Sequence, residues 1–231
     1  DTVDQSLFLT HSAGLSPSRP TQDSQYLSYY ADPAKPVPTV GGSLTSGAPV
    51  FVGGAFNQIE CSDFFGSQGN DMPLKQRADV LSFETEPLSE DVVVAGPVSI
   101  ELWVESDCPD TDFTAKLVDV YPASTDYPEG YAMNITDGIF RCRYRDSWSE
   151  PELLTPGKPF KITIEPFATC NVFKAGHCIR LDIASSNFPR FDVNPNSGEP
   201  EGSAALKRVA CNTLHLSAKM PSRLILRIRK A

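Results

Sequence analysis

The sequence has no long apolar run. None of its 231 residues lie in a stretch that approaches the roughly 18–20 apolar residues of a membrane-spanning helix, which excludes an integral membrane protein built on such helices. We therefore predict no membrane partner. Disorder is also excluded, because 40% of the residues are apolar and they recur with a regular spacing.

The sequence also lacks the short motifs of nucleophilic and metal-dependent chemistry. No G-x-S-x-G occurs, and the nearest imitations, at residues 14–18 and 66–69, break its spacing. The six cysteines include no C-x-x-C pair, which excludes zinc ribbons and thioredoxin-like redox sites. We therefore predict no catalytic residue, no metal site and no cofactor in this chain.

Positive charge is scarce. Twenty Lys and Arg face 29 Asp and Glu, a formal net charge of −9, and such a field repels a phosphate backbone. Four basic residues gather near the end of the chain, but apolar residues alternate with them: Arg223, Arg227, Arg229 and Lys230. This pattern indicates a terminal strand, so we predict no nucleic-acid partner.

The cellular compartment stays open. An even number of cysteines allows disulfides in an oxidising compartment, whereas a core of this size is equally compatible with free buried thiols. The sequon at Asn134 could carry a glycan on a secreted protein. We therefore weigh a cytoplasmic and a secreted protein equally. Because the first residue is Asp1 and not Met, we expect a processed chain or part of a larger one.

Histidines and clustered carboxylates fit structural roles. The three histidines, at 11, 177 and 215, have no base or metal ligand at a suitable spacing. We expect His177 to be a turn residue and His215 to face solvent. Three nearby carboxylates predict a solvated turn in preference to a calcium loop: Asp107, Asp110 and Asp112.

Asp119 is predicted to be a buried carboxylate that needs a partner of opposite charge. It shares strand parity with Phe113 and Leu117, so it points into apolar surroundings, where a carboxylate needs a counter-charge. A stripe of arginines that includes Arg141 and Arg143 lies on another predicted strand. We therefore predict a structural ion pair between Asp119 and this stripe.

Period-two alternation dominates the chain. In residues 96–105, one face carries Val98, Ile100, Leu102 and Val104. Further strands are predicted at 113–121, 139–145, 160–164, 179–183 and 224–228, with Gly, Pro, Asn and Asp clusters between them. Only residues 204–211 fit a helical turn or two. The pattern predicts an all-β fold, a jelly-roll β-sandwich with little helix.

The first third of the chain is less regular. Residues 16–38 are rich in Ser, Pro and Asp, and residues 41–70 are rich in Gly and Phe. Both predict long covering loops that carry isolated strands, and loops of this length in a compact domain usually contact something.

Several segments, in order along the chain, resemble the cocaine esterase and X-prolyl dipeptidyl-peptidase family, the CocE/NonD-type serine hydrolases. They are residues 36–42 (PVPTVGG), 110–120 (DTDFTAKLVDV), 134–138 (NITDG) and, most specifically, 175–198 with SSNFPRF at its centre. Together the similar segments cover most of residues 26–228.

The resemblance implies part of an enzyme. In that family the Ser-Asp-His triad lies on an α/β-hydrolase domain earlier in the chain, under a helical cap, and the C-terminal domain is a galactose-binding-like jelly roll. Residues 1–231 resemble that single domain, so no catalytic residue carries over. The implied partners are the catalytic domain of the same parent chain and a possible second copy. The family hydrolyses acyl esters, α-amino acid esters, β-lactam side chains or X-Pro peptides.

In this family, loops of the jelly roll help to wall the acyl pocket. The matching segment here runs from residue 42 to 79, and four aromatic residues are its candidate contacts: Phe51, Phe56, Phe64 and Phe65. Two rival hypotheses remain. One is a stand-alone carbohydrate-binding β-sandwich module with an aromatic platform. The other, a self-sufficient serine hydrolase, requires that a fluorophosphonate probe label this chain.

Overall fold

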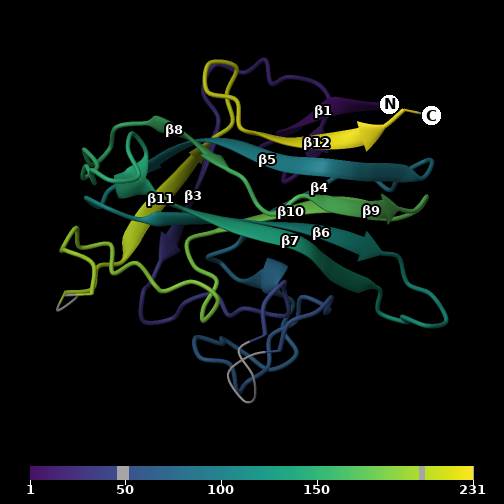
Figure 1. The fold of residues 1–231 in the computed structure, drawn as a ribbon, viewed down its shortest axis with the longest axis horizontal. Coiled ribbons are helices and arrows are strands. Elements are labelled where there is room, and N and C mark those ends of the chain that lie inside the picture. The colour runs from purple at the N-terminus through teal and green to yellow at the C-terminus, as the bar shows by residue number, and fades with distance from the viewer. Residues whose placement is uncertain (46–51, 203–205, 231) are drawn as a thin grey trace.

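Two antiparallel β-sheets pack face to face (Figure 1). The computed structural model describes residues 1–45, 52–202 and 206–230. The first sheet has the order β2–β1–β12–β5–β11–β3, with β8 and β9 paired to β5 as well. Its strands are β1 (Thr2–Leu9), β2 (Leu15–Ser16), β3 (Tyr26–Ala31), β5 (Val92–Ser106), β8 (Phe160–Ile164), β9 (Thr169–Phe173), β11 (Ala210–His215) and β12 (Arg223–Arg229).

The second sheet has the order β4–β10–β6–β7. Its strands are β4 (Leu81–Glu84), β6 (Asp112–Tyr121), β7 (Tyr131–Arg141) and β10 (Cys178–Ala184). The described residues also form two single-turn 3₁₀ helices, η1 (Leu74–Gln76) and η2 (Cys142–Tyr144). The fold is thus the predicted all-β jelly-roll sandwich with little helix. Within the described ranges, no helix has the length and apolar character that a membrane crossing requires.

The core lies between the sheets and follows the predicted alternation. Val98, Ile100, Leu102 and Val104 of β5 are at most 1% exposed. They pack against Leu117 and other apolar side chains of the second sheet. The inward face predicted for β5 is therefore confirmed.

The strand predicted for residues 139–145 is wrong at its end. β7 stops at Arg141, and the chain turns through η2. The buried Asp110 carboxylate accepts hydrogen bonds from both the backbone N–H and the Nε of Arg143, at 3.1 and 2.8 Å. These two bonds favour a turn where alternation predicts a strand.

The helical turn predicted for residues 204–211 is also wrong. Residues 203–205 lie outside the described part, but Ala210 and Cys211 begin β11. This strand pairs with β3 on one side and β5 on the other, so Leu214 lies between Leu27 and Val104. Two flanking strands satisfy its backbone and outweigh a weak local helix propensity.

Residues 32–45 and 52–80, between β3 and β4, form a covering segment over the outer face of the second sheet, below β6 and β7 in Figure 1. As a result, β10 is buried on both faces. Its inner side chains join the core, and its outer ones, Arg180, Asp182 and Ala184, are at most 6% exposed. The predicted covering loop therefore hides a charged sheet face from water.

Candidate functional site

Arg77 anchors the covering segment at one point. The turn η1 buries Leu74 and leads directly into Arg77, whose side chain is fully buried. All five N–H groups of the guanidinium donate: two to Asp79 and one to Glu60, each at 2.7 Å, and one each to the carbonyls of Gly66 and Lys35, at 2.9 and 3.0 Å. One side chain thus joins four parts of the segment.

Glu60 shares this cluster. Its second oxygen accepts bonds from Ser67 Oγ and the Gln68 N–H, both at 2.7 Å. Burial raises the pKa of Glu60, but the bonds from Arg77, Ser67 and Gln68 outweigh burial and hold the pKa below its ordinary value. Glu60 is therefore a charged, fully bonded carboxylate inside the protein.

A second anchor runs from Lys116 on β6. Its Nζ donates to Gln58 Oε1 at 2.6 Å, and Gln58 Nε2 donates to the carbonyls of Val40 and Phe56 and to Asn134 Oδ1. Asn134 Oδ1 also accepts the Phe56 N–H at 2.8 Å. Burial lowers the pKa of Lys116, against the attraction of nearby carboxylates. This buried chain of bonds fixes the backbone at Phe56.

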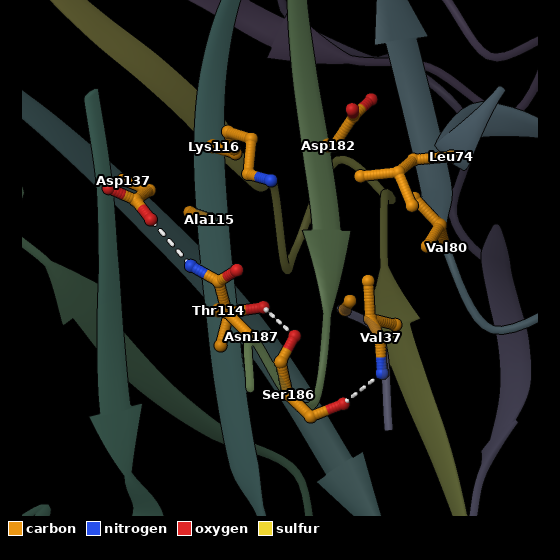
Figure 2. A pocket seen from close by; sticks show the side chains of 11 residues that line it. Val37, Leu74, Val80, Thr114, Ala115, Lys116, Asp137, Asp182, Ser186 and Asn187 are labelled. Atoms are coloured by element: carbon orange, nitrogen blue, oxygen red, sulfur yellow. Dashed lines mark hydrogen bonds between the residues drawn. The ribbon is translucent and has the colours of Figure 1, made fainter. Parts of the chain in front are cut away.

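Asp137 on β7 holds the loop that follows β10, which in turn pairs through its backbone with residues 37–39 of the covering segment. Its carboxylate accepts from Arg190 Nη1 on one oxygen and from Asn187 Nδ2 on the other. Beside it lies a small cavity between the sheet and the covering segment (Figure 2). Val37, Leu74 and Val80 form the covering side of the cavity, and Lys116, Asp182 and Asn187 form part of the sheet side.

The backbone depends on glycine where residues 41 and 42 meet residue 54. Gly42 and Gly54 exchange two backbone hydrogen bonds of 2.8 Å. Gly41 has φ +69°, and a Cβ there would lie 2.4 Å from the Gly54 carbonyl oxygen and 2.8 Å from the Phe56 ring. Only glycine combines this backbone conformation with so close an approach.

The four candidate aromatic residues divide into three groups. Phe51 lies outside the described residues. Phe64 is partly buried and packs against the small cluster around Val37 and Leu74. Phe56 and Phe65 are exposed, by 42% and 61%, and Phe65 meets Phe188 edge-on at a centroid distance of 5.4 Å. Among the described candidates, the solvent-facing aromatic residues of the covering segment are therefore Phe56 and Phe65.

The predicted pairing of Asp119 with an arginine is wrong. Asp119 is 1% exposed, as expected, but it contacts His177 Nδ1 at 2.8 Å and Asn171 Nδ2 at 3.3 Å. The β6–β7 register explains the error, because it places Met133 opposite Asp119 and Arg141 opposite Asp112, at the far end of the strand. Burial raises the pKa of Asp119, and the bonds from His177 and Asn171 offset only part of that rise.

The arginine stripe has other partners. Arg141 binds the fully buried Asp112 at 2.9 Å, and Arg143 binds the fully buried Asp110 at 2.8 Å. Asn194 Nδ2 joins both carboxylates at 2.7 Å. The solvated turn predicted for these aspartates is therefore wrong for Asp110 and Asp112, which are structural counter-charges, and right only for the exposed Asp107.

Two histidines lie in structural pairs. His177 packs against Tyr121 with tilted rings whose centroids are 4.3 Å apart, beside its bond to Asp119. His215 is 9% exposed and lies 3.2 Å from Glu105 Oε2, so the prediction that it faces solvent is wrong. Among the described residues, neither imidazole is hydrogen-bonded to a serine, threonine or cysteine. No described group of three or more His, Cys, Asp or Glu is placed to hold a metal ion.

The structure also describes the state of the cysteines and the surroundings of the sequon. All six cysteines are free thiols. Asn134, the acceptor of the sequon, is 7% exposed, and its Nδ2 donates to the Gly54 carbonyl. A glycan on this nitrogen is incompatible with the folded covering segment.

Comparison with known proteins identifies relatives along nearly the whole chain. Residues 2–225 match the family described as X-Pro dipeptidyl-peptidase C-terminal non-catalytic domain. Cocaine esterase from Rhodococcus sp. (strain MB1 Bresler) is 39% identical over 204 residues, which are 87% of this chain and 32% of that protein. This chain therefore spans about a third of the length of that relative.

Solved structures of other proteins also resemble this chain. An aminopeptidase from a marine sediment Thaumarchaeota archaeon superposes with a TM-score of 0.82 at 25% identity, covering 99% of this chain and 37% of that one. An α-amino acid ester hydrolase superposes with a TM-score of 0.79 at 28% identity, covering 98% and 36%. On the family match, which agrees with the sandwich fold, this chain belongs to the family of X-Pro dipeptidyl-peptidase C-terminal non-catalytic domains.

Proposed function

We propose that this domain packs on the catalytic α/β-hydrolase domain of a serine hydrolase and that its covering segment walls part of the acyl pocket. The parent enzyme would be an acyl esterase, an α-amino acid ester hydrolase or an X-Pro dipeptidyl-peptidase. The supporting observation is the exposure of Phe56 and Phe65 on a segment that two buried polar clusters, around Arg77 and Lys116, hold in place.

Such a surface acts by shape and by excluding water. The exposed ring faces of Phe56 and Phe65 offer apolar area to a partner, and neither residue can transfer a proton. The hydrogen bonds of Arg77 and Lys116 limit the entropy that docking costs, because they already hold the described part of the segment in place. The coverage of about a third of each relative is consistent with a larger chain that supplies the catalytic domain.

Amide exchange tests the docking. We expect residues 54–66 to exchange more slowly in the longer protein than in the 231-residue chain, whereas β5 exchanges equally in both. Equal exchange of residues 54–66 in the two proteins contradicts docking through this face. A gene that encodes no upstream hydrolase domain, together with binding on a glycan array, would favour the carbohydrate-binding module instead.

Substitution tests the pocket wall. In the longer protein, Phe56→Ala and Phe65→Ala should raise KM several-fold for substrates with bulky acyl groups and leave the folded domain intact. Phe167→Ala is the matched control, because Phe167 is 66% exposed but lies between β8 and β9. If KM is unchanged for both covering-segment variants, the pocket-wall role is wrong.

We also propose that the domain can pair with a second copy. β3 ends the strand order of the first sheet, so no described strand pairs with its outer edge. Tyr26 and Tyr30 on this strand are 56% and 69% exposed. Open strand edges readily pair with another chain. Sedimentation showing only monomer at tens of micromolar would contradict pairing.

A further inference from the structure

We propose that the cavity between the second sheet and the covering segment binds one water molecule, held by the Lys116 ammonium group and the Asn187 amide oxygen. Figure 2 shows the Lys116 amine and the Asn187 amide on the sheet side of this space, with Val37, Leu74 and Val80 opposite. The site is independent of whatever docks on the outer surface of the covering segment.

The Lys116 ammonium group has hydrogen-bond donors without an acceptor among the described residues. An ammonium group carries three N–H donors. Among the described residues, only Gln58 Oε1 accepts one of them, at 2.6 Å. Lys116 is 9% exposed, so bulk water reaches little of it. A buried charge with two unused donors is costly, and an internal acceptor beside it lowers that cost.

Asn187 has the complementary acceptor. Its Nδ2 donates to the Asp137 carboxylate, which accepts only, so the orientation of the amide is set by chemistry. The Oδ1 therefore points away from Asp137. This oxygen is buried, and it has no hydrogen-bond partner among the described residues. Asn187 itself is 3% exposed.

The other polar groups at the cavity are already bonded. Asp182 accepts from Ser82 Oγ at 2.6 Å and from Arg180 Nη2 at 3.0 Å. Thr114 Oγ1 donates to the Ser186 carbonyl at 3.3 Å. Asp137 is occupied by Arg190 and Asn187. Ser186 Oγ accepts the Val37 N–H at 2.8 Å and keeps its own O–H as a further donor. The unused donors of Lys116 and the unused acceptor of Asn187 are therefore complementary.

The cavity has the size for this ligand. The space open to a water-sized sphere is about 20 Å³. A site needs roughly 10–15 Å³ to hold one water, so this cavity has room for one. The water accepts one bond from Lys116 Nζ, donates one to Asn187 Oδ1, and rests against the apolar side chains of the covering segment.

Crystals of the 231-residue chain at about 1.5 Å resolution or better test the site directly. We expect one ordered peak within about 2.6–3.2 Å of both Lys116 Nζ and Asn187 Oδ1. A peak that touches only apolar atoms overturns the proposal. So does a cavity without a peak that takes up xenon under pressure, since dry apolar cavities bind this gas.

A double-mutant cycle gives a second, solution test. Ala184→Val adds two methyl groups at the cavity wall and should displace the water, lowering Tm by about 2–4 °C or more. In the Lys116→Met background the same substitution should lose this effect, because the ammonium no longer binds the water. Equal effects of Ala184→Val in both backgrounds, whatever their sign, overturn the proposal. If Lys116→Met does not fold, the crystallographic result decides.

Discussion

Replacing Arg77 by methionine should release the covering segment. The change keeps much of the side-chain volume but removes all five donors. It leaves the carboxylates of Glu60 and Asp79, whose side chains are 0% and 12% exposed, without their counter-charge. It also leaves the carbonyls of Gly66 and Lys35 without this donor.

The size of the effect follows from this environment. Removing one partner of a buried ion pair costs about 3–5 kcal/mol of unfolding free energy. For a chain of this length, about 2–4 °C of Tm corresponds to each kcal/mol, so a fully cooperative loss lowers Tm by about 6–20 °C. Arg227→Met is the control. Arg227 also pairs with a carboxylate, Asp4, but the two side chains are 38% and 56% exposed, and such pairs are worth about 0–1 kcal/mol.

Two measurements distinguish local opening of the covering segment from unfolding of the whole domain. Both tryptophans, Trp103 and Trp148, lie outside the covering segment, so fluorescence during urea unfolding reports on the sandwich. Amide exchange of residues 58–80 reports on the segment itself. We expect Arg77→Met to speed exchange in residues 58–80 even if the sandwich holds. If Arg77→Met and Arg227→Met change both readouts equally, the reasoning about the buried cluster is refuted.

Three further results are expected. Glu60→Gln should destabilise the chain at pH 7. Because the pKa of Glu60 is lowered in the folded state, the ionised carboxylate stabilises the fold above its ordinary pKa, and this stabilisation is lost as the pH falls. The difference in unfolding free energy between Glu60→Gln and wild type, measured by urea unfolding, should therefore shrink below about pH 4. A difference that stays constant with pH contradicts this. Gly41→Ala should cost several-fold more unfolding free energy than Gly176→Ala, since both have positive φ but a Cβ at Gly176 meets nothing within 4 Å; equal Tm losses would show that the close approach is unimportant. Expressed in a glycosylating host, the folded fraction should carry no glycan at Asn134, and a folded, glycosylated species in mass spectrometry would refute the structural role of that side chain.

The sequence by itself determined the fold class. Alternation such as Val98, Ile100, Leu102 and Val104 puts one face of a strand in the core in any sheet arrangement, so local pattern suffices to predict it. The missing serine elbow and the motifs around residues 110–120 and 175–198 likewise predicted a non-catalytic member of a hydrolase family. The segment that covers the sheet was recognised because its composition differs from that of the strands.

The tertiary structure decided which charges meet. Strand parity predicted that Asp119 points inward. Its partner is His177 and not Arg141 because of the β6–β7 register and the position of the loop before β10. For the same reason, the sequence did not predict the ion pairs around Arg77 or the hydrogen bonds that run from Lys116. Their partners are joined by folds of the covering segment and by sheet neighbours far away in sequence. Periodicity reports which way a side chain faces along its own strand, whereas an ion pair depends on which distant strand or loop lies across from it.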